Sequence, residues 1–133
     1  MLRLSEAFNG FDVTFVSVGP NYGADVPNHR YYGIRDVSRR DRLGYFVLLG
    51  QLIRILLIER PQVVITTGSA PGAITLALAK TFLHAKTIWI DSIANCEQMS
   101  TSGKHAHHFA DVWLTQWPAL ARPEGPQYLG AVL

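Results

Sequence analysis

The chain has one cysteine, Cys96, among 133 residues. A single thiol excludes an internal disulfide and fits a reducing compartment. Charged residues are also sparse, and 12 basic against 10 acidic side chains leave a net charge of +2. This balance indicates neither a nucleic-acid-binding surface nor an acidic tail. There are no repeats and no low-complexity tracts.

Long apolar runs are absent too. No stretch reaches the roughly 18 to 20 apolar residues that span a bilayer. Residues 1–10 lack the charged head and apolar run of a secretory signal. Hydrophobic residues nevertheless make up 48% of the chain, enough for a real core. We therefore expect residues 1–133 to form a single domain.

The most informative segment contains three short apolar runs, at residues 63–66, 87–90 and 112–114. Runs of this length fit strands that are buried on both faces of a parallel sheet. In such sheets, ligands bind just beyond the carboxyl ends of the strands. The polar and small residues that follow each run, at 66–72, 91–95 and 116–118, are therefore the candidates for function.

Strands and helices are expected to alternate along the chain. We expect strands at 13–18, 31–37, 62–66, 86–90 and 112–115, and helices at 2–8, 43–60, 72–83 and 103–109. Residues 19–29 and 92–102 should be loops, and residues 128–133 form either a terminal strand or an exit segment. This order predicts an α/β Rossmann-like fold of three layers, with a parallel sheet and right-handed crossovers.

A fold of this kind normally opens with a strand in the middle of its sheet, whereas this sequence opens with a predicted helix. Without that strand, the strands at 13–18 and 62–66 would flank a gap of unpaired backbone groups, each costing about 1 to 3 kcal/mol if buried. We therefore expect the sequence to be truncated at its N-terminal side, with Met1 an internal methionine.

An ordered set of short motifs carries a family resemblance. They read TGSAPG at 67–72, WIDSIA at 89–94, STSGK at 100–104, FAD at 109–111, TQWP at 115–118 and YLG at 128–130. Weaker similarity continues through FNGFDV at 8–13 and ERP at 59–61. In order and spacing, the set resembles the Alg14 family of oligosaccharide biosynthesis proteins and its bacterial exopolysaccharide relatives.

The resemblance implies the N-terminal-type half of a GT-B glycosyltransferase. This half offers the acceptor site, usually for a lipid-linked sugar, and recruits its partner to the cytoplasmic face of the membrane. The partner is a separate donor-binding subunit, and it carries the UDP-sugar, in the best-known cases UDP-N-acetylglucosamine. No metal or other cofactor is implied. A Gly-Gly-His loop, which usually follows the first strand in this family, does not occur in the sequence.

Candidate acceptor contacts are Gly68, Ser69, Gly72, Ser92 and Asn95. Backbone N–H groups at the start of the helix after Thr66 can face a phosphate or a sugar. An ordinary tight turn between strand and helix explains the same residues.

Asp91 ends a predicted buried strand and is our candidate catalytic residue. A carboxylate there can accept a hydrogen bond from an acceptor hydroxyl or serve as a base. Alternatively, it caps the following turn through backbone N–H groups.

Trp117 and the tail residues Tyr128, Leu129 and Gly130 are candidates for the partner interface. Core packing of the Trp117 ring is the alternative. His105, His107 and His108, with Cys96 upstream, resemble a metal tract, but on a helix they do not share one face, so we expect no metal site.

The predicted helix at 43–60 is apolar on nearly every side. Such a helix is either a core crossover helix or one that touches a membrane or a partner. Arginines at 35, 39, 40 and 42 would suit anionic headgroups, although Asp36 and Asp41 partly cancel them.

The resemblance thus implies the acceptor-binding and membrane-recruiting subunit of a two-part glycosyltransferase, active only with its partner. One rival is a non-catalytic scaffold that recruits and stabilises the donor-binding subunit. Another is a stand-alone nucleotide binder, against which the absence of a Gly-rich first turn argues.

Overall fold

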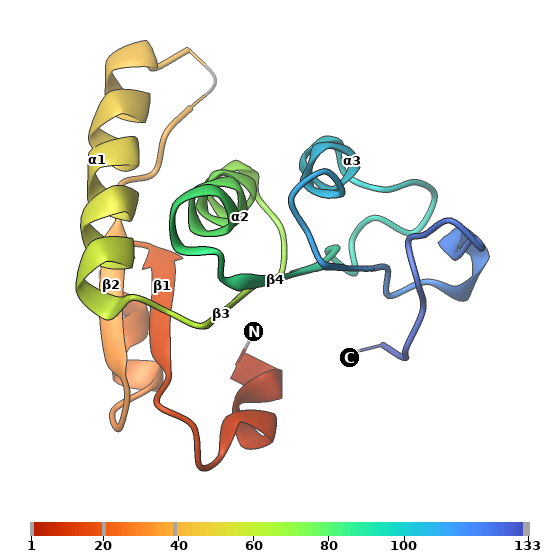
Figure 1. The fold of residues 1–133 in the computed structure, drawn as a ribbon, viewed down its shortest axis with the longest axis horizontal. Helices are drawn as coiled ribbons and strands as arrows, with labels where there is room; N and C mark the ends of the chain where they lie inside the picture. Colours follow the sequence, from red (N-terminus) through yellow and green to blue (C-terminus); the bar gives the residue numbers. More distant parts are fainter. Residues whose placement is uncertain (1, 20, 39, 132–133) are drawn as a thin grey trace. The chain divides into compact units, whose positions relative to one another are not determined.

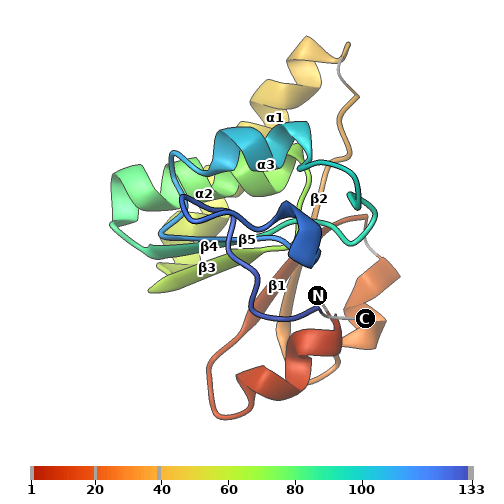
Figure 2. The same ribbon diagram turned by 90° about the vertical axis from the view of Figure 1, so that its right-hand side faces the viewer.

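The computed structural model describes residues 2–19, 21–38 and 40–131. The chain divides into two compact units, one over Leu2–Arg60 and one that begins at Pro61. Figures 1 and 2 show both units along the chain. Each has its own parallel sheet, with strand order β1-β2 in the first unit and β3-β4-β5 in the second.

The first unit consists of a two-stranded sheet, one long helix and two short 3₁₀ helices. Its elements are η1 (Leu2–Phe8), β1 (Thr14–Val18), η2 (Asn21–Asp25), β2 (Arg30–Ile34) and α1 (Arg42–Glu59). Thr14 pairs with Arg30, and Val18 pairs with Ile34. Parallel strands normally need a crossover of a dozen or more residues, and here the connection contains η2.

Helix α1 has clear signals at both ends. Asp41 caps its start, since the Asp41 carboxylate accepts a hydrogen bond from the Gly44 N–H at 2.8 Å. A β-carbon at Gly44 would lie 2.1 Å from the Asp41 carboxylate, so this close approach requires glycine. At the other end Arg60 is left-handed, with φ 43°, and Pro61 follows.

One side of α1 is core and the other is exposed. Gly44, Leu48, Leu52 and Leu56 are buried at helical spacing. Six large apolar residues lie on the solvent side: Leu43, Phe46, Val47, Ile53, Leu57 and Ile58. The interpretation as a core crossover helix therefore accounts for only half of its apolar residues. Arg39 lies outside the described residues.

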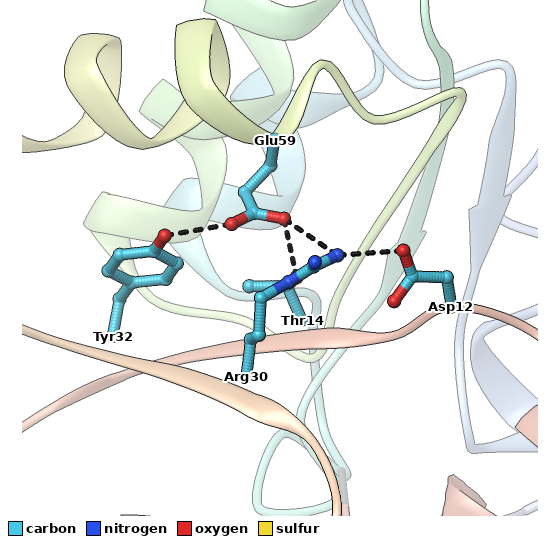
Figure 3. Close-up of polar contacts among 5 residues, drawn as sticks. All are labelled: Asp12, Thr14, Arg30, Tyr32 and Glu59. Carbon is cyan, nitrogen blue, oxygen red and sulfur yellow. Dashed lines mark hydrogen bonds and ion pairs between the residues drawn. The ribbon is translucent and has the colours of Figure 1, made fainter.

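The C-terminal residue of α1, Glu59, is tied to both strands of the unit (Figure 3). Its carboxylate accepts hydrogen bonds from the Thr14 hydroxyl at 2.9 Å and from the Tyr32 hydroxyl at 2.8 Å. It also pairs with Arg30 at 3.1 Å, and Arg30 in turn pairs with Asp12 at 2.8 Å. The hydrogen bond to Glu59 raises the pKa of Tyr32, and the hydrogen bond to Asp12 raises that of Arg30.

The second unit is an alternating α/β segment. It contains β3 (Val63–Thr66), α2 (Ala70–Leu83), β4 (Lys86–Ile90), α3 (Thr101–Ala106), β5 (Val112–Leu114) and η3 (Pro118–Leu120). Helices α2 and α3 contact each other and β4, and both lie over one face of the sheet (Figure 2). The core beneath them consists of Leu76, Trp89, Met99 and Ala106.

The predicted elements are confirmed with small shifts. Helix α2 begins at Ala70 rather than at residue 72, and α3 covers Thr101–Ala106 rather than 103–109, because serines cap both helices. The strand predicted at 31–37 lies at Arg30–Ile34, and η2 and η3 were not predicted.

At the C-terminal side, Gln127 makes one bridge to Leu114, and residues 128–131 form no strand, which matches an exit segment. Residues 132 and 133 lie outside the described part. Strands β1 and β3 belong to separate sheets. The expectations of a single domain and of a missing first strand stay predictions.

Candidate functional site

The carboxyl ends of β3, β4 and β5 lie at one edge of the second sheet. The strands are parallel, with Thr66 opposite Trp89 and Ile90 opposite Leu114. The segments that leave these ends are 67–72, 91–100 and 115–118, and together we call them the rim. The rim therefore contains every predicted acceptor contact as well as Asp91 and Trp117.

Asp91 lies at the centre of the rim and is 1% exposed. Its Oδ1 accepts hydrogen bonds from Trp89 Nε1 at 3.2 Å and from the Ser100 hydroxyl at 2.6 Å. Its Oδ2 accepts from Asn95 Nδ2 at 3.2 Å and from the Ser100 N–H at 2.9 Å. A buried carboxylate needs such donors, because an unpaired charge in the interior is costly. Through these hydrogen bonds, the carboxylate holds the loop at residues 92–99 against the end of β4.

Ser100 connects this carboxylate to α3. The Ser100 hydroxyl donates to Asp91 and accepts from the Gly103 N–H at 2.9 Å, so it also caps the helix. A β-carbon at Gly103 would lie 2.8 Å from Asp91 Oδ1 and 3.0 Å from Trp89 Nε1. Only glycine allows α3 to start this close to the carboxylate. The roles of Ser100 and Gly103 were not predicted, although a serine is a preferred residue immediately before a helix.

The end of β5 holds the same loop from the other side. Gln116 donates from Nε2 to the Asp91 carbonyl at 2.8 Å, and Trp117 donates from Nε1 to the Ile93 carbonyl at 2.8 Å. Gln116 is buried and Trp117 is half-buried. The indole N–H of Trp117 is therefore hydrogen-bonded to the loop that follows β4. Gln116, which sequence reasoning placed at a strand end without a role, joins two segments of the rim.

The turn between β3 and α2 has an unusual backbone. Gly68 has φ 124°, and Ser69 has φ 73° and ψ 158°, a conformation that residues other than glycine rarely adopt. Ser69 is exposed, and its hydroxyl accepts from the Gly72 N–H at a long 3.5 Å. A β-carbon at Gly68 would lie 3.9 Å from Cβ of Ser92, so this turn adjoins the β4 loop. A β-carbon at Gly72 would lie 2.1 Å from Thr66 Oγ1, which gives Gly72 a packing role.

Comparisons with known proteins agree with the motifs in this unit. The family model described as "Oligosaccharide biosynthesis protein Alg14 like" matches residues 44–132. The chain belongs to this Alg14-like family. The match includes all of the rim and most of α1.

A curated relative is similar to this chain in sequence, and a solved structure is similar to it in fold. Over 79 residues the chain is 29% identical to the "UDP-N-acetylglucosamine transferase subunit ALG14" of Eremothecium gossypii. That alignment covers 55% of this chain and 35% of the relative, so the chain spans about a third of the relative's length. The crystal structure of Acinetobacter baumannii MurG matches 98% of this chain and 40% of its own chain, with a TM-score of 0.73 and 12% identity. This likeness confirms the predicted GT-B N-terminal-type Rossmann-like fold.

Most of the predicted site residues lie close to one another in the second unit. Gly68, Ser69, Asp91, Ser92 and Trp117 lie on one rim, as the parallel strands predicted. Asn95 is half-buried and directs its amide to Asp91. Tyr128, Leu129 and Gly130 are exposed beyond the bridge at Gln127. The roles of these residues stay predictions.

The histidines lie away from the rim's hydrogen bonds. His107 follows α3, and its ring lies 5.2 Å from that of Trp113, between centroids. Within residues 2–19, 21–38 and 40–131, no three His, Cys, Asp or Glu side chains are grouped as metal ligands. In the same residues, no helix combines the length and hydropathy needed to cross a bilayer.

One perturbed carboxyl group lies at the opposite edge of the sheet. Asp111, just before β5, pairs with Lys80 and accepts from the Thr87 N–H at 2.9 Å. These contacts, the Lys80 hydrogen bond first, lower the pKa of Asp111 from 3.8 to about 2. The group lies at the amino ends of the strands, where its hydrogen bond to Thr87 links the residue before β5 to β4.

Proposed function

We propose that this chain is the acceptor-binding and membrane-recruiting subunit of a two-part glycosyltransferase. Membership of the Alg14-like family carries the proposal, together with a rim that contains the motifs TGSAPG and TQWP and most of WIDSIA. The partner is a donor-binding subunit that carries a UDP-sugar, and the name of the E. gossypii relative favours UDP-N-acetylglucosamine. The acceptor is a lipid-linked sugar at the cytoplasmic face of a membrane.

The rim suits a polar acceptor head group. The Thr67–Gly72 turn brings backbone N–H groups and the N-terminus of the 14-residue helix α2 to this edge. Helix N-termini favour phosphate and sugar oxygens, because their backbone N–H groups are unpaired and carry partial positive charge. The strained backbone of exposed Ser69, which follows Gly68 next to Ser92, is typical of a ligand-contacting turn.

The decisive experiment measures transfer of radiolabelled N-acetylglucosamine from its UDP form to lipid extracted from the source membranes. The chain, its copurified donor-binding subunit, and the two together are assayed separately. We expect label in the lipid fraction only when both polypeptides are present. Equal transfer by the donor-binding subunit alone in detergent would contradict an acceptor-binding role.

The burial of Asp91 favours a second candidate, a scaffold that only recruits and stabilises the donor-binding subunit. All four hydrogen bonds to this carboxylate come from its own loop, strand and helix cap, which is the geometry of a positioning residue. A base must reach the proton that it removes. The proposed function therefore assigns Asp91 to shaping the rim, and a catalytic role for it stays a prediction.

Asp91→Asn separates these roles. An amide donates where the carboxylate accepts, so two of the four donors lose their acceptor; we expect a loss of about 2 to 4 kcal/mol in unfolding free energy. Urea denaturation measures that loss, with exposed Asp25→Asn as the control, and the transfer assay runs in parallel. A catalytic role would show, in addition, transfer reduced 100-fold or more in Asp91→Asn protein that is still folded and still forms the complex.

A further inference from the structure

The solvent side of α1 is an apolar surface. Leu43 is 79% exposed and Phe46 73% exposed. Six exposed residues make up this surface, which we call the outer face of α1: Leu43, Phe46, Val47, Ile53, Leu57 and Ile58. Spacings of three, four and seven residues place these side chains along one stripe of the helix, opposite buried Leu48 and Leu52.

The charges on and beside the outer face are cationic. Arg54 lies within the stripe, Arg42 and Arg60 lie at its two ends, and Arg40 precedes it; all four are exposed. Two nearby acidic groups are engaged elsewhere. Asp41 caps α1 and pairs with Arg35 at 3.1 Å, and Glu59 points to Thr14, Tyr32 and Arg30. In the described part of 35–60, Asp36 is the remaining carboxylate, and it lies outside the helix.

We propose that the outer face of α1 docks on an anionic lipid bilayer. A helix of 18 residues is about 27 Å long, and it would lie in the plane of the interface with its apolar stripe below the headgroups. Arg54 can extend its guanidinium back to the phosphates, and the arginines at both ends meet the same layer. The stripe carries a cation and no acidic side chain. This pattern matches anionic lipid headgroups rather than the mixed charges at the periphery of a protein–protein interface.

This inference rests on the proposed function, because it names the element by which a membrane-recruiting subunit meets the membrane. The docked face is chemically distinct from the rim, which is built of backbone N–H groups and small polar side chains. The two can therefore be disabled separately.

The test is cosedimentation of the full chain with vesicles of phosphatidylcholine alone or with a quarter phosphatidylglycerol, at low and high salt. We expect binding to the anionic vesicles that weakens with salt. Phe46→Gln should lower the partition coefficient about tenfold, and Arg54→Gln about fivefold. The matched controls are Phe82→Gln on α2, since Phe82 is 72% exposed, and Arg122→Gln; neither should change binding.

Three kinds of result would overturn the inference. In the first, vesicle binding does not depend on the outer face: the chain does not bind anionic vesicles, or Phe46→Gln and Phe82→Gln lose binding equally. The second is loss of the donor-binding subunit from Phe46→Gln with vesicle binding intact, which would assign the face to that protein. The third is a dimer of the chain that Phe46→Gln dissociates, which would assign it to a second copy.

Failure of the proposed function gives a different result. In detergent with solubilised lipid acceptor, Phe46→Gln should transfer sugar at the wild-type rate, and on vesicles its rate should fall with its binding. If the wild-type pair transfers no sugar but vesicle binding still follows the outer face, the proposed function fails and the docking surface stands.

Discussion

At the residue scale, the rim depends on a few close contacts around one carboxylate. Parallel strands predict that Asp91 lies near Ser69 and Trp117, because their carboxyl ends share an edge. Its burial cannot be read from the sequence, since the donors that cover it include Ser100, nine residues onward, and are placed by tertiary packing. The hydrogen bond from Gln116 to the Asp91 carbonyl was not predicted for the same reason, because Gln116 follows another strand.

Gly103→Ala tests the tightest of these contacts. The added methyl group would meet Asp91, Ser100 and Trp89 within 3.0 Å. We expect the free energy of unfolding to fall by about 1 to 3 kcal/mol, the usual cost of overpacking. Gly50→Ala in α1 is the control, because nothing lies within 4 Å of its β-carbon; it should stabilise the protein by about 0.5 to 1 kcal/mol. Urea denaturation measures both, and equal stabilisation by the two variants would refute the contact.

Asp111 predicts a specific pH dependence of stability. Its folded pKa of about 2 lies below its ordinary 3.8, so the ionised carboxylate stabilises the fold above pH 4. This stabilisation is lost as the pH falls from about 4 to 2. In Asp111→Asn that component should be absent, so the stability of the variant should fall less steeply over this window. Parallel curves for the two proteins in acid urea titrations would contradict the assignment.

At the scale of elements, α1 is attached to β1 and β2 through its last residue. Glu59 has a side chain 10% exposed, with acceptor oxygens shared among Thr14, Tyr32 and Arg30. The sequence predicted the helix and both strands from apolar patterns and from Pro61. It did not predict this attachment, because the partners are separated by 27 to 45 residues.

Glu59→Gln should therefore loosen α1 on its sheet. The amide keeps the shape of the side chain but loses the ion pair with Arg30 and one hydrogen-bond acceptor. We expect a lower urea midpoint and faster amide hydrogen exchange in the last turn of α1, while Glu97→Gln, in an exposed loop, leaves both unchanged. Unchanged exchange in Glu59→Gln would show that packing of Leu52 and Leu56 alone holds the helix.

The starts of α2 and α3 show why helix boundaries were harder to predict than helix existence. Ser69 and Ser100 begin their helices earlier than the apolar pattern indicates. Both are cap residues, and Ser69 adopts a backbone conformation that no local rule favours for serine. Both serines belong to the rim.

At the scale of the whole molecule, the chain is an Alg14-like protein with a GT-B N-terminal-type fold and two compact units. The fold class and the family were predictable, because the alternation of strands and helices along the chain and the ordered set of motifs are properties of the sequence. The docking surface was not, since an apolar helix is equally typical of a core, and only the exposure of Leu43 and Phe46 separates the two.

The measurement that tests the account most directly is site-specific photocrosslinking in the complex with the donor-binding subunit. A benzophenone amino acid replaces Ser92 on the rim, Leu129 in the tail, or Thr81 on α2 as the control. We predict that the label at 92 captures the lipid-linked acceptor, the label at 129 captures the donor-binding subunit, and the label at 81 captures neither. Capture of the acceptor at 81 but not at 92 would contradict the account.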